Sequence, residues 1–87
     1  MKLTTLEEKI EAIEEAAHAV GGTVRDSYSG RGMYGRTCYG IDCDDDTECV
    51  VQAARRGLPT PSIDQMGRGY IVYWKTITKD APDAPKA

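Results

Sequence analysis

The stretch TVRDSYSGRGMYGRTCYGIDCDDD, residues 23–46, decides the fold. Residues 23–28 alternate between apolar and polar side chains, and residues 36–42 have strand character again. A glycine-rich loop separates these two strands, so they form either a hairpin or a longer connection across the loop. The acids of residues 44–46 then begin a helix, which we expect to run to about residue 56.

Upstream of this stretch, apolar side chains recur at helical spacing and predict a helix over residues 4–20. Thr5 followed by Glu8 has the pattern of a capping box, and the glycines at 21–22 supply a stop. The outer face of this helix carries five glutamates. The apolar positions that define its other face are Leu3, Leu6, Ile10, Ile13, Ala17 and Val20.

Downstream, Gly57 and Pro59 end the second helix. Residues 62–66 read as a short strand, and a turn at 67–69 leads into residues 70–77. The sequence of this last segment, YIVYWKTI, is the strongest strand pattern in the chain.

The element order is therefore α-β-β-α-β-β, which predicts a small α+β fold. We expect a single domain over residues 1–77, with an antiparallel sheet and two helices on one face. Residues 78–87 are polar and rich in Pro and Ala, so they are expected to form a disordered tail.

Composition limits the classes of function. The 87 residues hold 11 Lys and Arg against 14 Asp and Glu, a net charge of −3, which argues against bulk nucleic-acid or anionic-membrane binding. No stretch approaches the roughly 20 apolar residues that span a bilayer, and the first residues lack the apolar core of a signal peptide. Three cysteines without a C-x-x-C pattern indicate reduced thiols in the cytoplasm.

The segment GRGMYG, residues 30–35, matches the pattern G-x-G-x-x-G, in which glycines let backbone N–H groups converge on phosphate oxygens. A phosphate loop of an NTPase would run from a strand into a helix, whereas the residues after this loop look like a strand. Arg36 also stands where such a loop needs Lys. A P-loop NTPase is therefore excluded, and two interpretations remain: a phosphate-binding loop, or a flexible turn that needs positive φ.

Arginines and tyrosines around this loop favour a phosphorylated ligand. Arg31 and Arg36 offer the bidentate fork that suits phosphate, and Tyr28 and Tyr34 offer rings for stacking on a base. A second loop at 67–70 repeats the order glycine, arginine, glycine, aromatic, and would close the site if both loops met on one rim. The candidate ligand-binding residues are Tyr28, Ser29, Gly30, Arg31, Gly32, Met33, Tyr34, Arg36, Arg68 and Tyr70.

No catalytic residue, metal site or cofactor is expected. The acids from Asp42 to Asp46 begin like a calcium loop, but Thr47 stands where glycine is needed, so helix capping explains them. His18 is the only histidine and lies on a helix without a local Cys or Ser partner. Trp74 is either a core residue or a stacking residue of the site.

The runs VRDSYSGRGMYGRTCYGIDCDD and SIDQMGRGYIVYW resemble small hypothetical proteins of bacteriophage and prophage genomes. The resemblance covers about residues 23–75 and brings no known catalytic residues. In size, acidity and its arginine, tyrosine and glycine loop, the chain is also similar to phage anti-defence sponges, which sequester nucleotide immune signals as homo-oligomers. This resemblance implies the cytoplasm of a bacterial host.

These observations together predict a non-enzymatic protein that binds and sequesters a phosphorylated, nucleotide-like small molecule. Two alternatives remain: a protein-interaction module that uses its acidic helices, and a small nucleotide-cleaving enzyme. The narrow apolar seam of the helix at 4–20, on so small a domain, further predicts a homo-oligomer, most simply a two-fold dimer, unless the seam packs on the domain's own sheet.

Overall fold

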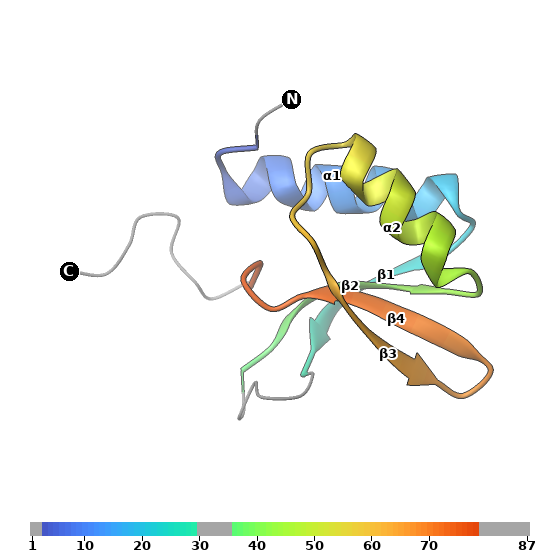
Figure 1. The fold of residues 1–87 in the computed structure, drawn as a ribbon. Helices are drawn as coiled ribbons and strands as arrows, with labels where there is room; N and C mark the ends of the chain where they lie inside the picture. Colours follow the sequence, from blue (N-terminus) through green and yellow to red (C-terminus); the bar gives the residue numbers. More distant parts are fainter. Residues whose placement is uncertain (1–2, 30–35, 79–87) are drawn as a thin grey trace.

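The structure is a computed structural model that describes residues 3–29 and 36–78. It has the predicted α+β order, in which each of two helices is followed by two strands. The strands form one antiparallel sheet in the order β1-β2-β4-β3, and both helices cover the same face of it (Figure 1). The elements are α1 (Leu6–Ala19), β1 (Thr23–Tyr28), β2 (Cys38–Cys43), α2 (Asp46–Arg55), β3 (Ser62–Met66) and β4 (Gly69–Trp74).

The helix ends follow the expected chemistry. At the start of α1, the Thr5 hydroxyl accepts the Glu8 N–H, and the Glu8 carboxylate accepts the Thr5 N–H in return, which completes the capping box. At the start of α2, Asp45 accepts the Glu48 N–H. Gly57 ends α2 in the left-handed region, with φ 87°, and the buried Leu58 donates its N–H back to the Ala53 carbonyl.

The strand register fixes which residues share a face of the sheet. In the central pair, Ile41 lies opposite Val72 and faces the helices, whereas Gly40 lies opposite Tyr73 on the other face, which we call the open face. A Cβ atom at Gly40 would lie 3.0 Å from the Cβ of Tyr73, so glycine leaves the room that the tyrosine side chain occupies.

The main core lies between the helices and the sheet. The apolar seam of α1 is used there: Ala12, Ile13, Ala16 and Ala17 are buried in the same cluster as Trp74. The domain itself therefore fills the central part of the seam that suggested a dimer, and the homo-oligomer stays a prediction. Trp74 is a core residue, because it is 2% exposed and its indole N–H donates to the Pro59 carbonyl at 2.7 Å.

The last strand is shorter than its sequence pattern suggested. It ends at Trp74, after which the Ile77 N–H turns back to the Trp74 carbonyl, and the Ile77 carbonyl accepts the Tyr39 N–H. Ile77 and Thr78 are buried, so Thr78, the first residue of the tail predicted over 78–87, packs with the domain, and residues 79–87 lie outside the described residues. Neither helix in the described part of the chain is long and apolar enough to span a bilayer.

Candidate functional site

The predicted ligand-binding residues fall at two opposite ends of the sheet. Tyr28 pairs with Cys38 at the start of β2, whereas Tyr70 pairs with Cys43 at the end of β2. The six residues of β2 separate these two ends by about 17 Å. Tyr28, Ser29 and Arg36 lie at the first end, and Gly30, Arg31, Gly32, Met33 and Tyr34 lie outside the described residues.

Arg68 and Tyr70 lie at the other end, at the turn between β3 and β4. Gly67 adopts φ 60° in a two-residue turn, and Arg68 beside it is exposed. Tyr70 is half-buried against the helix-side core, on the face opposite to Tyr28. Arg68 therefore does not share a rim with Arg36, so the expectation that Arg68 closes one site around the same anion does not fit the strand register.

At the first end, Tyr28 lies on the open face against Tyr73. The two ring centroids are 4.9 Å apart at an interplanar angle of 59°, and Tyr28 packs with the buried Cys38, Ile71 and Tyr73. The Tyr28 hydroxyl donates to an Asp64 carboxylate oxygen at 2.8 Å. Burial, together with this carboxylate, raises the pKa of Tyr28 to about 12, so the ring stays neutral and its hydroxyl is already committed as a donor.

Two exposed cations lie at this end of the sheet. Arg36 is exposed two residues before Cys38, and Lys75 is exposed one residue after β4. Trp74 pairs with Tyr39, so the next residue, Lys75, lies near Cys38. Burial raises the pKa of the Cys38 thiol, and the positive charge of Lys75 partly opposes this rise. Neither cation forms an ion pair or hydrogen bond with another residue in the described ranges 3–29 and 36–78.

Sequence reasoning missed Lys75 and Asp64. Lys75 sits inside the apolar run YIVYWKTI, where it looks like the solvent-facing position of a strand, and only the pairing of β2 with β4 brings it to Cys38. Asp64 lies on an edge strand, and its bond to Tyr28 crosses the whole sheet. No local spacing signals either contact.

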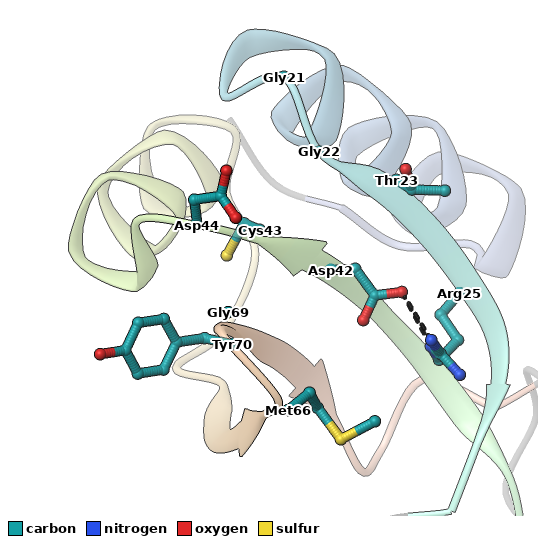
Figure 2. Close-up of a pocket in the computed structure, with 10 residues that line it drawn as sticks. All are labelled: Gly21, Gly22, Thr23, Arg25, Asp42, Cys43, Asp44, Met66, Gly69 and Tyr70. Atoms are coloured by element: carbon teal, nitrogen blue, oxygen red, sulfur yellow. Dashed lines mark hydrogen bonds and ion pairs between the residues drawn. The ribbon is translucent and has the colours of Figure 1, made fainter.

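A pocket of about 520 Å³ lies at the other end of the sheet, between the starts of β1 and β4 and the end of β2 (Figure 2). Its cation, Arg25, is paired with Asp42 at 2.9 Å, and the Asp44 carboxylate adds further negative charge. The Tyr70 ring points away from the Arg25–Asp42 pair in Figure 2. An anion would meet two carboxylates there, so this pocket is a poor phosphate site.

The three cysteines and the histidine lie away from the candidate site or are buried. Cys38, Cys43 and Cys49 are buried free thiols, and burial raises the pKa of each, that of Cys49 to about 12. His18 lies exposed on α1, on the helix layer and away from the open face. Among the described side chains, no group of three or more His, Cys, Asp and Glu is placed to hold a metal ion.

Comparison of the chain with protein-family models, with curated proteins and with solved structures finds no match.

Proposed function

We propose that this protein binds a small phosphorylated, nucleotide-like molecule and holds it without changing it. The observation that supports this most directly is the placement of Arg36 and Lys75, two exposed cations without a carboxylate partner in the described residues, just before β2 and just after β4, at the end of the sheet where Tyr28 lies. Arginine binds phosphate bidentately, lysine adds a point charge, and the half-buried ring of Tyr28 would provide a surface for a base, whereas the Tyr73 ring is buried beneath it.

The glycine-rich sequence 30–35 joins β1 to β2 at this same end. Backbone N–H groups of such a loop would add donors for phosphate oxygens, with Arg31 as a further cation. Specifically, we propose that the protein sequesters a nucleotide signal used in antiviral immunity. Sequestration needs no turnover of the ligand; it needs only high affinity and enough copies of the protein.

The distribution of charge favours a small ligand over a long polyanion. The exposed glutamates Glu7, Glu11 and Glu14 lie on α1, on the helix layer, whereas the open face at the end of β4 carries Lys75. A small anion meets only the local cations. A long nucleic acid would also meet the net charge of −3, which weakens its binding at moderate salt.

The first experiment identifies the ligand and tests whether it is altered. Protein purified without denaturant is washed by filtration and heated, and the released small molecules are analysed by mass spectrometry. The same protein is then titrated by calorimetry with a panel of cyclic nucleotides and ADP-ribose. An intact bound nucleotide supports the proposal, and an altered one indicates an enzyme. If no nucleotide co-purifies and none of the panel binds in calorimetry, the proposal is rejected in favour of an interaction module.

The second experiment tests the location. Arg36→Ala and Lys75→Ala should each weaken binding about 10- to 150-fold, since a charge-assisted hydrogen bond contributes about 1.5–3 kcal/mol. Arg68→Ala is the matched control, because Arg68 is equally exposed but lies at the opposite end of the sheet. Loss of binding in Arg68→Ala with full binding in Arg36→Ala and Lys75→Ala would move the site to that end.

A further inference from the structure

The outer edge of β3 has unpaired backbone groups. Among the described residues, β3 pairs only with β4, and the two-residue turn makes Met66 and Gly69 the closing pair of the hairpin. The closing pair of such a hairpin exchanges hydrogen bonds, and hydrogen-bonded pairs alternate along an antiparallel ladder. Asp64 and Ser62 therefore also bond to β4, so Ile63 and Gln65 direct their N–H and C=O groups away from the sheet.

Two side chains of this edge are apolar and exposed. Ile63 is 41% exposed and Met66 is 39% exposed, and with Val51 on α2 they are the exposed large hydrophobic residues of the described chain. Neither lysine nor arginine occurs within β3, although such charges commonly protect edge strands from pairing.

The other edge of the sheet is protected. Arg25 and Asp26 put charges in the middle of β1, and the pairing with β2 shifts register between Arg25 and Tyr28. A charged edge with an irregular register is a poor template for a further strand. The two edges therefore differ, because β3 has a regular register and a single charge, Asp64, which is engaged by the Tyr28 hydroxyl, and β3 is the edge open to pairing.

We infer that β3 pairs antiparallel with β3 of a second copy, with Ile63 on the two-fold axis. In this register Ile63 lies opposite Ile63 of the partner, and Ser62 lies opposite Asp64, where a hydroxyl can donate to a carboxylate. The outward N–H of Gln65 meets the carbonyl of Pro61, and Pro61 has no N–H that would be left unpaired. The segment is thus complementary to itself.

The symmetric registers centred on the next two residues, Asp64 and Gln65, are less favourable. Centring the pair on Asp64 places two like charges directly opposite each other, which destabilises a strand pair. Centring it on Gln65 places Ile63 opposite Gly67, which belongs to the turn and has φ 60°. Of these three two-fold registers, the one centred on Ile63 combines apolar contact with a polar pair.

The rest of the fold leaves room for this pairing. The main helix contacts are with β1, β2 and β4, and Figure 1 shows both helices above one face of the sheet, with β3 below them at the front. The result is one continuous sheet across two copies. This surface lies on another strand from Arg36 and Lys75, so it stands whether or not the proposed ligand site is right.

The first test is the oligomeric state of the full chain by sedimentation velocity as concentration rises toward the millimolar range. The wild type should shift from the mass of one chain to that of two, and Ile63→Lys should weaken this association about tenfold or more. Val51→Lys is the matched control, because Val51 is 39% exposed but lies on α2. A wild type that stays a monomer, or a dimer weakened only by Val51→Lys, would overturn the inference.

The second test measures the register. Ile63→Cys should form an intermolecular disulfide under mild oxidation, since hydrogen-bonded partners have Cα atoms about 5.5 Å apart, within the range that a disulfide spans. Gln65→Cys should not, because its two copies would be displaced about 13 Å along the strand direction. The wild-type protein, in which all three native thiols are buried, measures the background level of cross-linking. Equal cross-linking of both variants, or of Gln65→Cys alone, contradicts the register.

Discussion

The hydroxyl of Tyr28 donates to the carboxylate of Asp64 at 2.8 Å and thereby joins the two edge strands of the sheet across its open face. β2 and β4 lie between them in the sheet. The open face is not covered by a helix, yet Ile71 and Tyr73 on it are at most 2% exposed. The Tyr28 side chain, packed against this cluster, contributes to that burial.

Tyr28→Phe should lower the free energy of unfolding by about 1 kcal/mol at neutral pH, the usual contribution of one hydrogen bond. The effect should depend on pH, because the pKa of Tyr28 rises from its ordinary value of 10 to about 12 on folding. The unfolded chain loses this proton first, so the contribution is complete below pH 10 and is lost as pH rises to 12. Urea unfolding of both proteins between pH 8 and pH 12 measures it.

Tyr70→Phe provides the comparison, because the Tyr70 hydroxyl forms no hydrogen bond with any residue described in the structure. It should unfold like the wild type across this pH range. If Tyr28→Phe and the wild type differ by the same amount at every pH, the pKa of Tyr28 is not raised on folding.

Two adjacent glycines should respond to alanine for different reasons. A Cβ atom at Gly22 would collide with the Asp42 carbonyl oxygen, which is part of the backbone and cannot move aside, so Gly22→Ala should cost about 2–3 kcal/mol. Gly21 has φ 68° and open space around it, so Gly21→Ala should cost only the left-handed strain, about 1 kcal/mol. Chemical denaturation measures the free energy of unfolding of both variants. A larger loss for Gly21→Ala than for Gly22→Ala would contradict the packing of β1 on β2.

The three thiols should be unreactive in the folded protein. All are buried, and burial raises their pKa, that of Cys49 to about 12, so little thiolate exists at pH 8. A thiol reagent such as DTNB should react slowly with the native protein and rapidly with all three cysteines in urea. One fast-reacting thiol in the native protein would show that a cysteine is accessible and active.

Arg31 lies outside the described residues, and its role remains a sequence-based prediction. If the glycine loop binds phosphate, Arg31→Ala should weaken binding of the identified nucleotide about 10- to 150-fold, and Arg31→Lys should recover part of it. Gly32→Val should weaken binding by blocking the close approach of the backbone. Arg55→Ala on α2 is the control; full binding by Arg31→Ala would mean that the loop is only a turn.

The sequence predicted the element order because its signals were local. Thr5 with Glu8 marked the start of α1, Gly57 marked the end of α2, and β1 and β3 have the predicted bounds. The end of the last strand was wrong because apolar residues continue past Trp74: Ile77 is buried through a turn rather than through strand pairing.

The site was harder to predict because it depends on pairing between distant segments. Arg68 matched the loop chemistry of Arg36, and nothing local indicated that the strand order would put them at opposite ends. Lys75 came to the candidate site only through the pairing of β2 with β4. Residue type suggested the ligand class, whereas topology decided which residues are neighbours.

The sheet order also has a consequence for folding kinetics. β1 pairs with β2 and β3 pairs with β4, each with its nearest neighbour in sequence, and only the central pair joins distant parts of the chain. Each helix with its hairpin is therefore a locally assembled half. The slow step should be the meeting of β2 with β4, so substitutions along that seam should retard refolding more than substitutions at either edge.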